Sequence, residues 1–436
     1  MARDKTTKIG RREVLRRTAL LTVGAAAPYV VPASALGRGK KAAANERVTL
    51  GFIAMGGIGR RLLRWFMNSE DAECVAICDA YADRREGAAA LTGAKSYRDF
   101  RQVLARDDVD AVIISPPDHW HVPIANAAAR AGKHVYVEKP LGLSIEQDLT
   151  CRQVIQDAGV VFQYGTRFRS QAHTCFGCEL VRNGKIGELK ALEVVAPNGA
   201  AGGSTQEAPV PDGLDYEMWL GPAPYKPYTV DRCVIPGVYW IHDYSIGYLA
   251  GWGAHALDLL VWGCDADLAG PMTFEGTGEI PAEGLYDTVY NWDVTVQMAG
   301  GVKMTFRPGR DSTKFIGSEG WVEVRSGGID AEPKSLLDVK FTADDLRLVA
   351  SDRAPSQTPH GGATVHQQNF LDAILGRQPA VAPLKDAVRS DIISHLSNIA
   401  VRTGRRITWD PDKEQILGDA DAAELLHRPL REPWTL

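Results

Sequence analysis

The sequence predicts an α/β protein whose N-terminal part binds a dinucleotide and whose C-terminal part carries a second, open sheet. A strand-like run at residues 48–53 leads into a glycine-rich turn, and an acid follows at the end of the next strand. Later segments alternate apolar and polar residues between glycine turns, as strands with one buried face do. The length of 436 residues exceeds one usual hydrophobic core. In the second part the expected strands are residues 189–195, 272–280, 290–298, 302–307 and 321–325, and the expected helices are 171–182, 366–375 and 384–402.

The glycine-rich turn at residues 54–59 has the features of a dinucleotide-binding fingerprint, with one departure. Gly56 lets the backbone approach a pyrophosphate, Gly59 allows close packing of helix on strand, and the helix at residues 60–66 offers N–H donors at its start. Ala54 occupies the place of the first glycine, which is tolerable if its φ stays negative. The predicted cofactor contacts from this turn are Ala54, Met55, Gly56, Gly57, Ile58 and Gly59.

An acidic residue, Asp79, stands about 20 residues after Gly59, at the end of the strand at residues 75–78. A carboxylate at this place accepts hydrogen bonds from an adenosine ribose and repels a 2′-phosphate, which favours NAD over NADP. Arg84 and Arg85 are close enough in sequence to weaken that preference, so NADP stays possible. The sequence therefore predicts NAD as the cofactor, with Asp79 and Arg84 among the residues that contact it.

Two further strands bring a lysine to the same sheet edge. Residues 111–114 are continuously apolar, as in a parallel strand buried on both faces, and residues 115–117 form the loop at its end. After a helix at residues 122–130, the strand at 134–137 delivers Lys139 to the carboxyl edge, where ligands of open α/β sheets bind. The remaining predicted cofactor contacts are Ser115, Pro116, Asp118, His121, Glu138, Lys139 and Gln163.

Five more segments join these motifs to give the chain a family resemblance. They are residues 97–100 (YRDF), 131–135 (AGKHV), 163–166 (QYGT), 253–258 (GAHALD) and 369–372 (NFLD). From about Val48 to the C-terminus the chain resembles the Gfo/Idh/MocA oxidoreductases, the relatives of glucose-fructose oxidoreductase and inositol dehydrogenase. The resemblance implies a Rossmann domain at residues 47–165 and a C-terminal α/β domain at residues 166–436. The open, mainly antiparallel sheet of that second domain forms one wall of the active site and often an oligomer interface, so a homo-oligomer is expected.

Oxidation of a carbinol needs a base within hydrogen-bond reach of the hydroxyl, and Lys139 and His255 are the predicted proton-handling groups. Asp258, at i+3 from His255 on one helix face, is predicted to orient the lysine or to hold the substrate. The resemblance also implies that these three residues line the reacting carbon. Each has an alternative role: Lys139 caps a strand edge, His255 is a satisfied core histidine, and Asp258 pairs with an arginine of the last helix.

Sugar contacts are predicted for Arg167, Asp243, Tyr244 and His255, because carboxylates bridge hydroxyls and aromatic faces stack on pyranose rings. Many relatives carry an aspartate where this chain has Gly251, which puts any role of that carboxylate in doubt. A long loop at residues 197–236 contains several aromatic residues. It either covers the cleft or packs down onto the sheet.

Residues 1–35 resemble a twin-arginine signal, because Arg11 and Arg12 precede a modestly apolar stretch and a small-residue cleavage site that ends at Ala35. Cleavage there, before a linker at residues 36–46, predicts export to the periplasm by the twin-arginine translocation machinery. That route carries folded proteins, and free NAD is scarce outside the cytoplasm. The cofactor is therefore expected to travel with the enzyme, tightly bound, and to be regenerated in place.

Composition argues against several other partners. The net charge is −5 and no basic stripe is present, so a nucleic-acid partner is not expected. The seven cysteines define no disulfide framework. Cys175 and Cys178 have no second close pair, which a zinc site of this type needs, so no metal is predicted.

The expected function is that of an exported NAD(P)-dependent oxidoreductase, which transfers hydride between its cofactor and a hydroxyl carbon of a sugar, polyol or glycoside. Two alternatives stay open. One is a redox-assisted glycoside hydrolase or lyase that uses bound NAD with no net redox change. The other is a non-catalytic sugar-binding protein that retains the fold.

Overall fold

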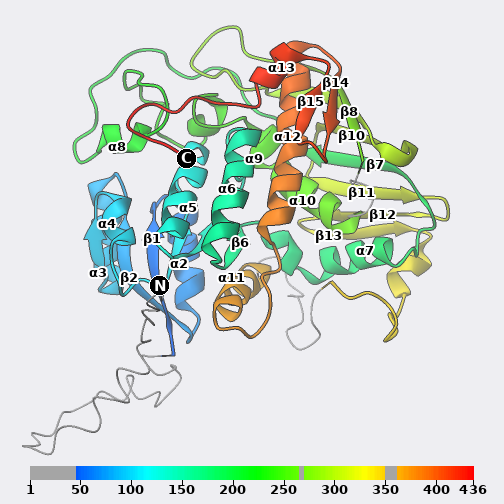
Figure 1. Cartoon of the computed structure of the whole chain (residues 1–436), viewed down its shortest axis with the longest axis horizontal. Coiled ribbons are helices and arrows are strands. Elements are labelled where there is room, and N and C mark those ends of the chain that lie inside the picture. Colours follow the sequence, from blue (N-terminus) through cyan, green and yellow to red (C-terminus); the bar gives the residue numbers. More distant parts are fainter. Residues whose placement is uncertain (1–45, 265–269, 349–360) are drawn as a thin grey trace, which may run out of the picture. The chain divides into compact units, whose positions relative to one another are not determined.

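Six parallel strands form the first sheet, in the order β3-β2-β1-β4-β5-β6 (Figure 1). The computed structural model describes residues 46–264, 270–348 and 361–436. The strand order reverses between β1 and β4, and ligands of open α/β sheets bind at such a switch point. The strands are β1 (Val48–Ile53), β2 (Ala72–Cys78), β3 (Lys95–Tyr97), β4 (Ala111–Ile114), β5 (His134–Val137) and β6 (Phe162–Tyr164). The helices around them are α2 (Gly57–Met67), α3 (Ala82–Thr92), α4 (Phe100–Leu104), α5 (His121–Arg130) and α6 (Ile145–Ala158).

The central strands of this sheet are buried on both faces, as is typical of parallel sheets. The sequence of β4, Ala-Val-Ile-Ile, is buried at every position. Ile113 belongs to an apolar cluster with Phe66 of α2, whereas its neighbour Val112 belongs to the cluster formed with Val103 of α4 and Ala125 of α5. Successive side chains of a strand point to opposite faces, so helices cover the sheet on both sides.

The second sheet has nine strands in the order β13-β12-β11-β7-β10-β9-β8-β14-β15. β7 and β10 pair in parallel and the other pairs are antiparallel, which confirms the predicted open, mainly antiparallel sheet. β11, β13, β14 and β15 were not among the predicted strands. The strands are β7 (Leu189–Ala196), β8 (Met272–Glu279), β9 (Asn291–Gln297), β10 (Lys303–Pro308), β11 (Ser312–Gly317), β12 (Trp321–Arg325), β13 (Gly328–Glu332), β14 (Ile407–Asp410) and β15 (Gln415–Leu417).

Helices pack on one face of the second sheet and join it to the first. Every residue of α10 is buried, and α10 contacts α12, α7 and the strands β7 and β11. α12 also contacts α6, beside which it lies in Figure 1. One apolar cluster therefore continues from β5 through these helices to β9. The helices of this part are α7 (Ala172–Arg182), α8 (Tyr216–Leu220), α9 (Tyr248–Gly251), α10 (Gly253–Gly263), α11 (Gly361–Ile374), α12 (Leu384–Thr403) and α13 (Ala420–Glu424).

The long loop at residues 197–236 contains the short helix α8 and packs its aromatic residues into a separate cluster. Tyr216, Trp219 and Tyr228 are buried there together with Tyr244. The same loop also lines a cavity at the edge of the first sheet. It therefore both packs down onto the protein and forms a wall of this cavity. Tyr225 is the exception, since 58% of its surface is exposed.

The predicted targeting segment, residues 1–35, and most of the linker at 36–46 lie outside the described residues. Within the described ranges, the chain has no helix that is both long enough and apolar enough to cross a membrane. All seven cysteines are buried free thiols. Burial raises the pKa of Cys175 and of Cys178, so neither is poised as a thiolate.

Candidate active site

A cavity of about 450 Å³ opens at the carboxyl ends of β1, β2 and β4, at the switch point of the first sheet. The glycine-rich turn forms one wall, and the loop from residue 218 to residue 239 forms the opposite one. Eight predicted cofactor residues line it, namely Ala54, Gly56, Gly57, Ile58, Asp79, Arg84, Ser115 and Pro116. Its other lining residues include Met218, Trp219, Val234, Ile235 and Tyr239.

The turn fits a dinucleotide through its glycines. A Cβ at Gly59 would lie 2.1 Å from the carbonyl oxygen of Ala54, so only glycine allows the helix to pack this closely on the strand. Nothing lies within 4 Å of where a Cβ would stand at Gly56 or Gly57. These two residues leave open space at the start of α2, where the first N–H groups of the helix can meet a pyrophosphate.

Ala54 corrects one expectation, because its φ is +74° and not negative. Its N–H donates to the carbonyl of Cys78 at 2.8 Å, and its carbonyl accepts from the hydroxyl of Ser115 at 3.0 Å. These two bonds hold the left-handed conformation that the fingerprint turn requires. The turn therefore imposes a positive φ on Ala54, although residues with a Cβ disfavour this conformation.

We expect Ala54→Gly to stabilise the protein by about 1 kcal/mol, because the left-handed conformation costs an alanine but not a glycine, and the greater entropy of the unfolded glycine offsets part of the gain. Thermal unfolding checks this. Ala88→Gly, in the interior of α3, is the matched control and should destabilise the protein. A lower Tm for Ala54→Gly would contradict the idea that the positive φ strains the alanine.

Asp79 stands at the end of β2, as predicted, and its carboxylate is held by the backbone. Oδ2 accepts from the N–H of Met55 at 2.5 Å and Oδ1 from the N–H of Tyr81 at 2.7 Å. Burial raises the pKa of Asp79, and these two N–H groups oppose that rise. Arg84 lies over the ring of Tyr81, 3.8 Å from its centroid, and also reaches the cavity. An acid and an arginine thus share the ribose end of the cavity.

Lys139 follows β5 and lies at the same edge of the sheet. Its Nζ donates to the carbonyl of Gly251, in α9, at 2.6 Å. Burial lowers the pKa of Lys139, while the carboxylates of Glu138 and Asp118 oppose that change. Both carboxyls are themselves buried, and Asp118 Oδ2 has no hydrogen-bond partner among the described residues. A lysine with a lowered pKa is a suitable proton acceptor.

His255 lies in the first turn of α10, where its ring stacks on Phe168 with centroids 4.3 Å apart. It is 2% exposed, and within the part of the chain that the structure describes its Nδ1 has no hydrogen-bond partner. Burial lowers the pKa of His255 well below its usual value, and the positive charges of Lys139 and Arg167 lower it further. The imidazole is therefore neutral, with a free ring nitrogen that can take or give a proton.

Asp258 lies one turn beyond His255, and Arg169 holds both of its oxygens. The Nε–Oδ2 distance is 2.8 Å and the Nη2–Oδ1 distance is 2.6 Å. Arg169 also donates to Asp386 of α12 at 2.7 Å. The predicted pairing with an arginine is thus present, but the arginine comes from the segment before α7 and not from the last helix. A catalytic role for Asp258 stays a prediction, since its carboxylate is already paired.

The predicted sugar contacts do not lie together. Tyr244 is fully buried, and its hydroxyl accepts from Arg232 at 3.0 Å, so its role as a sugar contact stays a prediction. Asp243 lines a second cavity of about 210 Å³, together with His242 and Arg428. Arg167 stays near the catalytic edge, because its charge lowers the pKa of His255.

Two predicted cofactor contacts, His121 and Gln163, form hydrogen bonds within the protein. His121 lies between the carbonyls of Pro140 and Pro116, with its ring nitrogens 2.6 and 3.0 Å from their oxygens. Gln163 donates to the carbonyl of His366 at 2.6 Å. Both are buried and connect the strand-end loops to one another and to α11.

Three aromatic residues near this edge were missed in the sequence. Tyr239 lines the cavity, and its ring centroid is 5.8 Å from that of Tyr248, which belongs to the same short helix as Gly251. Trp252 follows and lies 5.8 Å from His255. These partly exposed rings form an aromatic wall, since Tyr248 also lies 6.3 Å from Trp252, and Gly251, between these two in the chain, accepts from Lys139. Only the run of aromatic residues at 239–252 could have indicated it, since no helical or strand period marks them.

Known proteins share these features. The description "Oxidoreductase family, NAD-binding Rossmann fold" matches residues 48–166, and "Oxidoreductase family, C-terminal alpha/beta domain" matches residues 201–436. An alpha-N-acetylgalactosaminidase from Shewanella oneidensis is 37% identical over 156 residues, which are 32% of this chain and 33% of that protein. An inositol 2-dehydrogenase from Rhizobium meliloti is 29% identical over 154 residues, 35% of this chain and 46% of that protein. The chain thus spans less than half of the length of either relative.

A solved structure, the WlbA dehydrogenase from Bordetella pertussis in complex with NADH and UDP-GlcNAcA, has the same fold. Its TM-score is 0.64 at 16% sequence identity, and the match covers 84% of this chain and 98% of that one. The two family descriptions together account for most of the chain and agree with the parallel nucleotide sheet and the mixed second sheet. The chain therefore belongs to the Gfo/Idh/MocA family of NAD-binding oxidoreductases.

Proposed function

We propose that the protein transfers hydride between a tightly bound NAD and a hydroxyl carbon of a sugar, polyol or glycoside. One observation carries the proposal: at the edge of the nucleotide sheet Lys139 donates to the carbonyl of Gly251, and His255 lies one turn further along the chain, in the first turn of α10. The aromatic wall of Tyr239, Tyr248 and Trp252 supports a cyclic substrate, because such rings stack on the apolar face of a pyranose.

NAD, when bound, accepts or returns the hydride. The residues of the chain handle the proton and the position of the substrate. Lys139 takes the hydroxyl proton, and the carbonyl of Gly251 keeps its Nζ in place before the substrate arrives. His255 is neutral and can exchange that proton with solvent or with the lysine. Glu138 and Asp118 stabilise the lysine once it is charged.

Export and tight retention of the cofactor are parts of the same proposal. The twin arginines and the small-residue site before residue 36 support a periplasmic location reached by the twin-arginine machinery. Retention is supported by the loop that forms the outer wall of the cavity, where Val234 and Ile235 reach the nucleotide side. N-terminal sequencing of the exported protein tests the first part, and an intact Met1 on a cytosolic product would refute it.

We also propose self-association through the open second sheet, which light scattering of the purified protein tests.

The decisive experiment follows the absorbance of the bound nicotinamide. The purified protein is mixed with hexoses, polyols and glycosides in turn, without added NAD. We expect a stoichiometric rise or fall of the reduced-nicotinamide band with one class of sugar. No change with any sugar, despite nucleotide released on denaturation, would refute the net oxidoreductase and leave the redox-neutral cycle or a sugar-binding protein.

A second candidate function is glycoside cleavage with no net redox change, favoured by the likeness to the Shewanella oneidensis alpha-N-acetylgalactosaminidase. Transient oxidation of a hydroxyl carbon acidifies the neighbouring C–H, the aglycone leaves by elimination, and water and the hydride then return. Turnover in D₂O distinguishes the two functions. Cleavage places solvent deuterium on the carbon next to the oxidised one in a hydrolysed product, whereas simple oxidation gives an uncleaved ketone or lactone.

A further inference from the structure

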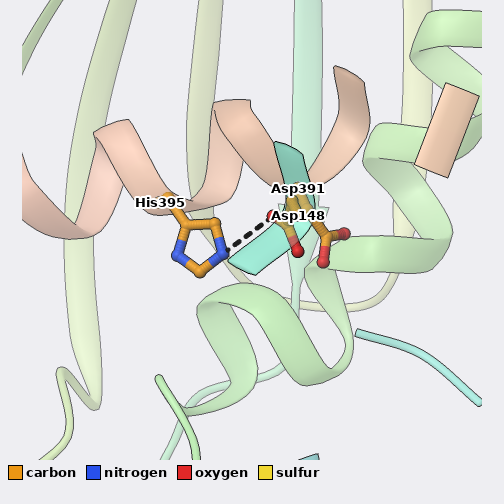
Figure 2. A group of neighbouring side chains, drawn as sticks. All are labelled: Asp148, Asp391 and His395. Carbon is orange, nitrogen blue, oxygen red and sulfur yellow. Dashed lines mark ion pairs between the residues drawn. The ribbon is translucent and has the colours of Figure 1, made fainter. Parts of the chain in front are cut away.

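Three buried side chains form a cluster beside the segment that carries Lys139 (Figure 2). Asp391 and His395 lie one turn apart on α12, and Asp148 faces them from the first turn of α6. His395 Nε2 is 3.3 Å from Asp148 Oδ2, and none of the three residues is more than 4% exposed. Two carboxylates and one imidazole thus lie together, buried between two helices.

The cluster contacts the backbone directly after Lys139. The N–H of Leu141 donates to Asp391 Oδ2 at 2.5 Å. A Cβ at Gly142 would lie 2.5 Å from Asp148 Oδ1, so any larger residue there would force this carboxylate to move. The segment that follows the lysine therefore rests on both acids, and Asp391 fixes it by a hydrogen bond only two residues away.

We propose that Asp391 is a positioning residue for Lys139, acting through the backbone of Leu141 and through its charge, with Asp148 and His395 holding it in place. The second oxygen of Asp391 accepts from the hydroxyl of Tyr164 at 2.8 Å, which fixes its orientation. The proposal rests on the assignment of Lys139 as the proton acceptor of the proposed function.

The charge of this cluster depends on pH. Burial and Asp148 raise the pKa of Asp391 to about 8, while His395, Tyr164 and the N–H of Leu141 oppose the rise. Burial raises the pKa of Asp148 well above its usual value and lowers that of His395 to about 4. Among the described residues, the other titratable or charged groups that face the cluster are Lys139 after β5, Cys151 on α6, Tyr164 in β6, His242 before α9 and Arg428 near the C-terminus.

Lys139 responds to this charge. Burial lowers the pKa of Lys139, and the ionised forms of Glu138, Asp118 and Asp391 oppose that change. The interaction is reciprocal, because two coupled groups titrate as one system. As pH rises through the pKa of Asp391, its carboxyl becomes charged and supports the pKa of Lys139; removing that charge in this pH range therefore lowers the pKa of Lys139, whereas a merely structural contact would leave it unchanged.

A divalent cation is the competing explanation, because carboxylates and an imidazole are donors that such ions accept. One observation argues against it. Both oxygens of Asp391 already accept hydrogen bonds from the protein. Elemental analysis of the purified protein belongs to the test. One equivalent of metal, lost in Asp148→Asn, would overturn the proposal.

The test compares Asp391→Asn with Ser390→Ala in the full-length, cofactor-loaded protein. The asparagine keeps an oxygen for Leu141 and removes the charge. Ser390 is its buried neighbour on α12, and its hydroxyl bonds only to the carbonyl of Ala387 at 2.9 Å among the contacts described. For Asp391→Asn we expect kcat to fall roughly tenfold to a hundredfold with little change in KM, because a neutral amide oxygen holds the N–H of Leu141 less strongly than a carboxylate does and lets the base shift. Ser390→Ala should keep wild-type kinetics.

The pKa of Lys139 can also be measured without any substrate, from the pH dependence of its modification by a small amine reagent followed by peptide mass spectrometry. We expect a lower midpoint in Asp391→Asn, no shift in Ser390→Ala, and a return toward the wild-type midpoint in Asp391→Glu. Equal midpoints in wild type and Asp391→Asn would overturn the proposal. Failure of the proposed function would give a different result. The absorbance of the wild-type cofactor would then stay unchanged with every sugar, whatever the labelling of Lys139 shows.

Discussion

Lys139→Ala should retain its NAD and lose turnover, with kcat lower by about 10²- to 10⁴-fold, the usual contribution of a positioned acid or base. The side chain reaches the carbonyl of Gly251 and does not line the nucleotide cavity, so its removal leaves the cofactor contacts in place. Nicotinamide reduction by the active sugar, followed in a stopped-flow instrument, measures the effect. Nucleotide released on denaturation measures the cofactor content.

The pH dependence of the turnover rate gives a second test of this prediction. A base must be unprotonated, so the rate of the wild type rises as pH increases through the lowered pKa of Lys139. That rise should be absent in Lys139→Ala. Lys133→Ala is the matched control, because Lys133 precedes the same strand at its opposite end and donates to the carbonyl of Arg106 at 2.7 Å. Normal turnover in Lys139→Ala would refute the assignment of the base.

The elements of both sheets could be predicted where the hydrophobic period was long or continuous. β4 is apolar at every position, and α11 and α12 coincide with the two helical patterns predicted at residues 366–375 and 384–402, so their places followed from the sequence. β13 and β15 are short and lie at or near the edges of the second sheet, and their mixed residues show no regular alternation. Each pairs with the strand just before it in the chain, β13 with β12 and β15 with β14, and this pairing, not a local preference, makes them strands.

The candidate site could be predicted only where a motif has a fixed backbone geometry. The fingerprint turn placed Gly59 and Asp79 correctly, because strand, turn and helix determine their positions. The φ of Ala54 and the partner of Asp258 could not be read from spacing. Arg169 is 89 residues before Asp258 in the chain, and such a pair is visible only once the helices have packed.

Arg169→Met should destabilise the protein by about 3–5 kcal/mol, the usual cost of removing one partner from a buried ion pair. Arg169 is 1% exposed, holds Asp258 by two bonds and Asp386 by a third, and lies 5.2 Å from the centroid of the ring of Trp262. Methionine fills much of the space but leaves the two carboxylates without a counter-charge. Chemical denaturation at neutral pH measures the loss of free energy of unfolding.

The pH dependence of that loss tests the electrostatic cause. Burial raises the pKa of Asp258 and Arg169 opposes the rise, so the pKa rises further in Arg169→Met. A carboxyl whose folded pKa is raised keeps its contribution to stability at low pH and loses it as pH increases. The variant should therefore be closer to the wild type at pH 5 than at pH 8. Arg307→Met, from the exposed pair with Asp293, should show no such dependence, and an equal loss at both pH values in Arg169→Met would assign its effect to packing alone.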